Sequence, residues 1–136
     1  MSIAKRIITS GKRKTSVAKA VIAEGTGRVT INKRDHNTLQ LFDKLKIEEP
    51  LRIAEHILGK ANFDVVISVN GGGEKSQIEA ARIALSKALV RFSKSNELER
   101  AFISYDRNLL VADVRRKEAR KPGDSRARAK RQKSYR

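Results

Sequence analysis

The sequence contains no cysteine, which excludes disulfides, thiolate metal sites and cysteine nucleophiles. No stretch approaches the run of about 18 apolar residues that spans a bilayer. The N-terminus also lacks the apolar region of a secretory signal. We therefore expect a protein that is neither exported nor embedded in a membrane, and the lack of cysteine is compatible with a reducing cytoplasm.

Acidic residues are scarce at both ends of the chain, which has a net charge of +16. Residues 1–19 carry six Lys or Arg and no acid, and residues 113–136 carry eleven Lys or Arg against three acids. Residues 20–112 are nearly balanced, with fourteen basic and twelve acidic side chains. A nearly neutral body with two positive ends is typical of a protein that binds a polyanion.

The length of 136 residues predicts a single domain. Apolar periodicity stops near Val114, so we expect a compact body over residues 1–114 and an extended basic tail over residues 115–136. From Lys117 onward the tail has too few apolar residues to offset its ordering entropy by burial. We expect it to stay disordered until an anionic partner fixes it.

The first third of the body has β character. Residues 7–9 predict a short strand, and residues 15–23 predict a second one. Residues 24–27 have turn composition, and residues 28–32 alternate strictly, as a half-buried strand does. We interpret the segments around the 24–27 turn as a hairpin.

The middle of the chain predicts a helix and then a buried strand. Pro50 is tolerated in a first helical turn, so a helix is expected to begin at Glu49-Pro50 and to end at Gly59. The continuous run from Phe63 to Val69 predicts a strand at the centre of the sheet.

Two further helices have sequence signals at their starts. Ser76 and Glu79 resemble a capping box, and helical spacing follows at Ile78, Ala81, Leu85, Leu89 and Phe92. Asn96 with Glu99 predicts the start of a shorter helix that contains Leu98 and Phe102.

The glycine triplet Gly71-Gly72-Gly73 lies between the buried strand and the long helix, which is the position of phosphate-binding loops. The dinucleotide pattern fails because Ser76 occupies the place of its third glycine. No Gly-Lys-Ser/Thr follows at P-loop spacing, and Glu74 would repel a phosphate. We favour a tight structural turn that requires positive φ and close packing.

Nothing else in the sequence indicates catalysis. His36 and His56, the only histidines, have no metal-ligand spacing to each other or to a carboxylate pair. The sequence contains no Gly-x-Ser-x-Gly nucleophile motif. We therefore predict no enzymatic activity, no cofactor and no metal.

The basic clusters carry the strongest functional signal. Lys12, Arg13 and Lys14 lie at an expected bend between strands, where three cations can reach separate phosphates, and no acid is close in sequence. In residues 126–131, cations alternate with small residues, which lets an extended backbone pass close to RNA. Near the end, Tyr135 lies between Lys133 and Arg136 and offers a face on which a base can stack.

Three motifs resemble the small-subunit ribosomal protein nine family. They are Gly11-Lys12-Arg13-Lys14-Thr15-Ser16-Val17-Ala18 at the N-terminus, the central set Gly71-Gly72-Gly73, Ser76-Gln77, Ala80, Ala84 and Lys87-Ala88-Leu89, and the terminus Gln132-Lys133-Ser134-Tyr135-Arg136. The last is similar to the archaeal and eukaryotic form of the family. Arg131 departs from the family pattern, in which an aromatic residue precedes this ending.

The resemblance implies an α+β fold like the second domain of ribosomal protein five, with a sheet of about four strands and helices packed on one face. It implies a non-enzymatic role in the head of the small ribosomal subunit in the cytoplasm. The expected partners are small-subunit ribosomal RNA, P-site transfer RNA and neighbouring ribosomal proteins, with no membrane and no small-molecule substrate.

The resemblance also implies which residues bind each RNA. The expected transfer RNA ligands are Lys133, Ser134, Tyr135 and Arg136. The expected ribosomal RNA ligands are Lys12, Arg13, Lys14, Arg115, Arg116, Lys117, Arg120, Lys121, Arg126, Arg128, Lys130 and Arg131.

Two other functions fit the sequence less well. A DNA-binding protein would need a cluster of base-reading side chains on one helix, whereas the long helix is expected to expose Glu79, Arg82, Ser86 and Arg91, a mixed set. A nucleotide-dependent enzyme would have to use the glycine turn. Competition between structured RNA, duplex DNA and ATP for the same sample would separate the three.

Overall fold

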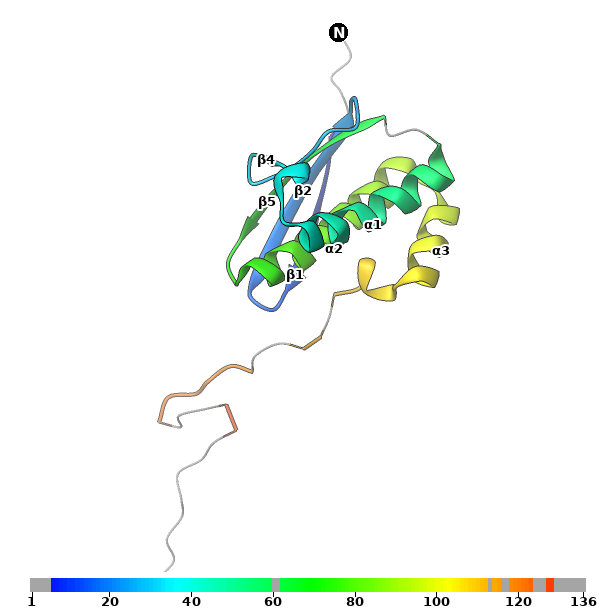
Figure 1. The fold of residues 1–136 in the computed structure, drawn as a ribbon. Coiled ribbons are helices and arrows are strands. Elements are labelled where there is room, and N and C mark those ends of the chain that lie inside the picture. Colours follow the sequence, from blue (N-terminus) through cyan, green and yellow to red (C-terminus); the bar gives the residue numbers. More distant parts are fainter. Residues whose placement is uncertain (1–5, 60–61, 113, 116–117, 124–126, 129–136) are drawn as a thin grey trace, which may run out of the picture.

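The chain forms an α+β body, as predicted, in which three α-helices cover one face of a mixed sheet (Figure 1). The computed structural model describes residues 6–59, 62–112, 114–115, 118–123 and 127–128. The strands are β1 (Ile7–Arg13), β2 (Ser16–Glu24), β3 (Val29–Ile31), β4 (Arg34–Asp35) and β5 (Phe63–Asn70). The helices are α1 (Leu41–Leu58), α2 (Glu74–Ser93) and α3 (Asn96–Tyr105), with short 3₁₀ turns at His36–Thr38 and Arg107–Leu109.

The sheet has five strands in the order β1-β2-β5-β3-β4, one more than the expected four. The additional strand is β4, which has two residues and lies at the edge. The central position predicted for residues 63–69 is confirmed, because β5 pairs with β2 on one side and β3 on the other.

The predicted hairpin around residues 24–27 is wrong. β2 pairs with β1 through a tight turn, and β5 lies between β2 and β3. Alternation in β2 and β3 fixes which side chains face the core, but it carries no information about which strands are neighbours. β3 is parallel to β5, so the chain needs a crossover between them, and α1 provides it.

Helix α1 begins well before the predicted start at Pro50. Asp43, Ile47, Pro50 and Ala54 are buried at helical spacing, so one buried face continues through the proline. The proline removes one backbone donor inside the helix, but its ring is part of the packed face. The predicted end is confirmed, because Gly59 caps the helix with a φ of 85°.

Helix α2 begins at Glu74 after the N-cap Gly73, so the predicted capping box at Ser76 is wrong. The helical spacing is confirmed: Ile78, Ala81, Leu85 and Leu89 are buried, and Phe92 is partly buried against them. The expected outward face is wrong in part. Ser86 is fully buried and donates a hydrogen bond to the carbonyl of Arg82, and the Arg82 side chain is also mostly buried.

Helix α3 is capped by Ser95, one residue before the predicted Asn96. The Ser95 hydroxyl accepts a hydrogen bond from the amide of Leu98 at 3.2 Å. Leu98 and Phe102 are fully buried, as their spacing predicted.

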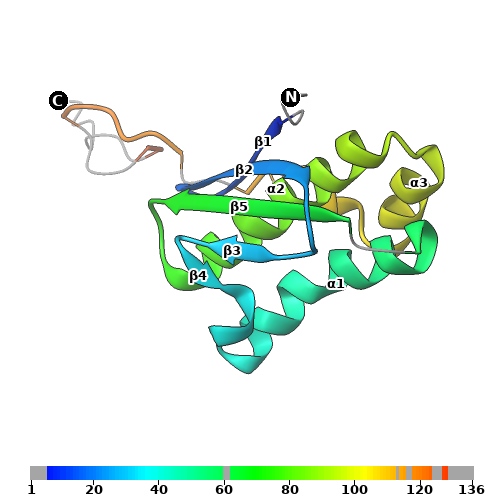
Figure 2. The same cartoon turned by 90° about the horizontal axis from the view of Figure 1, so that it is seen from above.

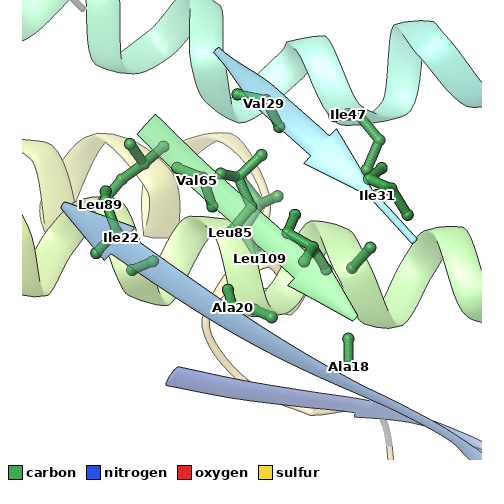
Figure 3. Packing of buried hydrophobic residues seen from close by; sticks show 14 of the residues in the cluster. Ala18, Ala20, Ile22, Val29, Ile31, Ile47, Val65, Leu85, Leu89 and Leu109 are labelled. Carbon is green, nitrogen blue, oxygen red and sulfur yellow. The ribbon is translucent and has the colours of Figure 1, made fainter. Parts of the chain in front are cut away.

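The core lies between the sheet and helix α2, where alternate residues of β2, β3 and β5 meet the helices (Figure 3). Strand β1 approaches α2 most closely. The Thr9 hydroxyl donates a 2.8 Å hydrogen bond to the carbonyl of Ala84. A Cβ on Gly11 would lie 2.5 Å from the carbonyl oxygen of Ala80, so glycine permits this backbone-to-backbone packing.

The opposite face of the sheet is left open. Figure 2 shows the strands side by side with the helices on one side, and no other element of the described chain covers the second face. Beyond Leu109 the described residues contain no further helix or strand. The division into a body of residues 1–114 and a tail of residues 115–136 stays a prediction.

Candidate nucleic-acid interface

The three cations of the N-terminal cluster point in different directions. Lys12 and Arg13 are the last residues of β1, so their side chains lie on opposite faces of the sheet. Lys12 is opposite Val17 on the open face, and Arg13 is on the face covered by helices. Lys14 lies in the turn with a φ of 53°, and its side chain is exposed.

Arg13 is engaged within the fold, contrary to the expectation that no acid lies near the cluster. Its Nε donates to Glu79 at 2.6 Å, and only 12% of its side chain is exposed. Lys46 of α1 approaches the same carboxylate at 3.8 Å. Glu79 is 66 residues away along the chain, so only the packing of α2 against β1 brings the two together.

Arg82 forms a second charged link between the helices. It pairs with Glu49 of α1 and with Asp106, which follows α3, the latter at 3.5 Å. A pocket of about 170 Å³ lies between the two links. Arg115, the first predicted ribosomal RNA ligand of the tail, lines it, so the root of the tail adjoins these ion pairs.

The tail is described only in part. Arg120, Lys121 and Arg128 are exposed, and Arg128 Nε contacts Glu118 at 2.9 Å. Both partners of this pair are largely exposed, so we assign it little stability. The remaining predicted ligands lie outside the described residues: Arg116, Lys117, Arg126, Lys130, Arg131, Lys133, Ser134, Tyr135 and Arg136.

A group of cations beside β1 was not evident from the sequence. A groove of about 260 Å³ is lined by Lys19 of β2 and by Lys87 and Arg91 of α2, together with Ser10 and other residues of β1 and β2. Two signals indicate these residues: Lys19 is two positions from Val17 and Val21 and so shares their face of β2, and Lys87 and Arg91 are four apart on one helix. Their convergence requires the tertiary fold.

The glycine triplet is a structural turn, as we favoured. Gly71 and Gly72 have φ values of 79° and 66°. A Cβ on Gly71 would lie 2.6 Å from the carbonyl oxygen of Thr15, and one on Gly72 would collide with Ser16. The Ser16 hydroxyl donates to the Gly71 carbonyl at 2.8 Å, which joins this turn to the start of β2.

Asp64 organises the turn between β2 and β3. Its carboxylate accepts hydrogen bonds from the amides of Arg28 at 3.0 Å and Thr26 at 3.1 Å, and it leaves no room for a Cβ on Gly25. The Arg28 amide is the main cause that holds the pKa of Asp64 below its ordinary value of 3.8. The carboxylate therefore stays ionised and stabilises the turn.

Neither a metal-ligand cluster nor a membrane-spanning helix is found in the part of the chain that the structure describes. The described residues contain no group of His, Cys, Asp and Glu arranged to hold a metal ion. The Nδ1 of His36 is hydrogen-bonded to the carbonyl oxygen of Val29 at 3.2 Å. Within the same part of the chain, no helix has the length and apolar content required to cross a membrane.

Comparison with known proteins decides the family. Residues 11–136 match the family model described as ribosomal protein S9/S16. The chain belongs to the ribosomal protein S9/S16 family. The small ribosomal subunit protein uS9 of Methanococcus vannielii is 47% identical over 135 residues, which cover 97% of this chain and 99% of that protein. The uS9 proteins of Methanococcus maripaludis and Thermoplasma volcanium are also 47% identical, and the latter match covers 96% of this chain and 98% of that protein.

Membership of the S9/S16 family confirms the resemblance drawn from the three motifs, all of which lie within the matched residues. It also confirms the prediction of a non-enzymatic protein, because this is a family of ribosomal proteins. In this chain the glycine turn packs against the start of β2, and Arg13 pairs with Glu79 of α2.

Proposed function

We propose that this protein is a structural constituent of the small ribosomal subunit, located on the ribosome in the cytoplasm. It binds ribosomal RNA in the subunit head and contacts neighbouring ribosomal proteins there. The observation that carries this proposal is the 47% identity to small ribosomal subunit proteins uS9 over nearly the whole chain. The positive ends and the nearly neutral body agree with it.

Ribosomal RNA binding is assigned to exposed cations of the turn and the tail. In the N-terminal cluster, Lys12 and Lys14 are exposed and suited to phosphates, whereas Arg13 supports the fold through Glu79. The 24 residues from Asp113 to Arg136 span at most about 80 Å when fully extended, so the cations of the tail can bind RNA far from the body.

The C-terminal tip is assigned to P-site transfer RNA. Arg136 and Lys133 offer donors to phosphates, Ser134 offers a hydroxyl, and Tyr135 offers a face on which a base can stack, worth roughly 1–3 kcal/mol. Salt screens contacts between cations and phosphates, so we expect this contact to be modest and sensitive to salt.

Removing Lys133–Arg136 tests the assignment of the tip. We expect small subunits that carry the truncated protein to assemble normally, because the body and the upstream tail hold the ribosomal RNA. Transfer RNA should dissociate faster from the P site of these subunits. The rate should rise by the amount expected from the loss of one or two contacts between the tip and the transfer RNA. The measurement is the dissociation rate of P-site transfer RNA, compared with full-length protein across a salt series.

Two outcomes contradict the assignment in different ways. Unchanged dissociation at every salt concentration means that the tip is not a transfer RNA ligand. Failure of the subunits to assemble means that the tip is a structural anchor instead.

A further inference from the structure

The open face of the sheet carries an apolar row across three strands. Ile8 of β1 is paired with Val21 of β2, and Val21 is paired with Val66 of β5. Ile8 and Val66 are 54% and 52% exposed. These exposed apolar side chains are aligned by the strand register, and Ile8 also lines the groove beside β1.

The next rows on the same face are polar and basic. Ser10, Lys19 and Ser68 are aligned across β1, β2 and β5. Beyond them, Lys12 and Asn70 are both paired with Val17. Beside the apolar row, Lys19 therefore lies between two serines, and in the row after it the exposed Val17 lies between Lys12 and Asn70.

The groove beside β1 extends this surface around the edge of the sheet. It joins Ser10 and Lys19 of the open face to Lys87 and Arg91 of α2, and none of the described residues that line it is acidic. Asp64 lies on this face at the start of β5, and its carboxylate accepts hydrogen bonds from the amides of Thr26 and Arg28. Asp35 lies farther away on β4, and its carboxylate accepts a hydrogen bond from the amide of Asn37. The surface over β1 and β2 is complementary to a polyanion.

The shape and chemistry of the surface indicate which polyanion fits. Unpaired bases bind proteins largely by stacking on aromatic side chains. Among the described residues, no aromatic side chain lies on this face, because Phe63, the one aromatic residue of the strands, points into the core. An A-form RNA helix presents a wide, shallow minor groove edged by phosphates and lined by 2′-hydroxyls. Serine hydroxyls suit those groups, and lysines suit the phosphates.

We propose that the open face over β1, β2 and β5, with the groove formed by Lys19, Lys87 and Arg91, binds the minor-groove side of a double-helical segment of ribosomal RNA. The proposal rests on the proposed function, since it assumes that the partner is small-subunit ribosomal RNA. It adds an RNA contact on the body, which adjoins Lys12 of the N-terminal cluster and is separate from the tail.

Directed cleavage from one introduced thiol locates the partner of this face. The chain has no cysteine, so Ser68→Cys provides a single attachment point for an iron chelate that generates hydroxyl radicals. Arg100→Cys, on the exposed side of α3, is the matched control. After assembly with small-subunit ribosomal RNA, we expect the Ser68→Cys protein to cut both strands of one helix across its minor groove. The Arg100→Cys protein should not cut there.

Charge removal gives an independent readout. The variant Lys19→Gln with Lys87→Gln and Arg91→Gln should flatten the slope of log K against log salt by about two units, at roughly 0.7–0.9 per phosphate contact. The control variant Arg52→Gln with Arg100→Gln and Arg107→Gln loses the same charge from exposed helical positions and should keep the original slope. Thermal unfolding establishes that both variants are folded.

The outcomes separate this inference from the proposed function. Failure of the unaltered protein to bind small-subunit ribosomal RNA overturns both. Normal binding by the unaltered protein, with equal slopes for the two charge variants, overturns only the inference. Cleavage confined to unpaired RNA would show that the partner of this face is not double-helical. Protection of position 68 by another ribosomal protein would show that the face is a protein interface instead.

Discussion

At the scale of single residues, neighbouring cations in the sequence have different roles. Lys12 and Lys14 are exposed, whereas Arg13 is mostly buried against Glu79. A run of basic residues in a strand distributes its side chains over both faces of the sheet. Because only one face of the sheet is open, we assign Lys12 and Lys14 to RNA binding and Arg13 to stabilising the fold.

This division predicts two separable effects. Lys12→Gln with Lys14→Gln should flatten the slope of log K against log salt for ribosomal RNA binding by about one and a half units and leave stability unchanged. Arg13→Gln should instead lower the free energy of unfolding by roughly 1–3 kcal/mol, because Glu79 loses its closest partner. Salt-series binding and denaturant unfolding of both variants check this, and a full loss of slope from Arg13→Gln alone at unchanged stability would contradict it.

Asp64 predicts a pH dependence. Its pKa is lowered in the folded protein, so its ionised carboxylate contributes stability that is fully present above its ordinary pKa of 3.8. This contribution is lost as the pH falls through the folded pKa. Asp64→Asn should therefore be less stable than the unaltered protein near neutral pH, and the difference should shrink below about pH 4. Unfolding curves of both proteins between pH 7 and pH 3 measure it, and a difference that is independent of pH would exclude the mechanism.

At the scale of elements, the contact between β1 and α2 sets the shape of the body. The backbones of β1 and α2 lie in close contact because the residues between them are small. These residues are Gly11 on the strand and Ala80 and Ala84 on the helix. The same contact brings Arg13 to Glu79 and leaves Lys87 beside the edge of β1. Packing in the core thus determines which cations reach the surface together.

Gly11→Ala tests this contact. The added methyl group would meet the backbone of α2, which cannot move away as a flexible side chain could, so we expect a loss of about 1–3 kcal/mol of unfolding free energy. Gly73→Ser is the control, because a Cβ there meets nothing within 4 Å and serine is a good N-cap. It should change stability by only a few tenths of a kcal/mol. Equal effects of the two substitutions in denaturant unfolding would contradict the close packing.

The elements that could be predicted from the sequence are those with long, regular patterns. Strand β5, the buried face of α2 and the two buried residues of α3 follow from their periodicity. The start of α1 could not be predicted, because the buried face of that helix contains Asp43 and Pro50, which do not resemble a helical core. The position of β5 between β2 and β3 depends on the crossover, which a local pattern does not record.

At the scale of the whole molecule, the charge distribution could be predicted from the sequence, but the candidate site could be predicted only in part. The two basic ends were evident in the sequence, and the comparisons support their place in a ribosomal protein. The groove of Lys19, Lys87 and Arg91 was not evident in the sequence. Lys19 is far along the chain from the other two residues, and none of the three has a basic residue directly beside it. The pairing of Arg13 with Glu79 was hidden for the same reason.

The central claim is that this protein is a constituent of the small ribosomal subunit, and co-sedimentation tests it most directly. A tagged full-length chain, produced in the cells from which it comes, is followed through a sucrose gradient after a high-salt wash of the ribosomes. We predict that the chain stays with the small subunits in a fixed ratio to their ribosomal RNA, because the body and tail together make many RNA contacts. Release of the chain by the wash into the soluble fraction, with small subunits left intact, would contradict the account.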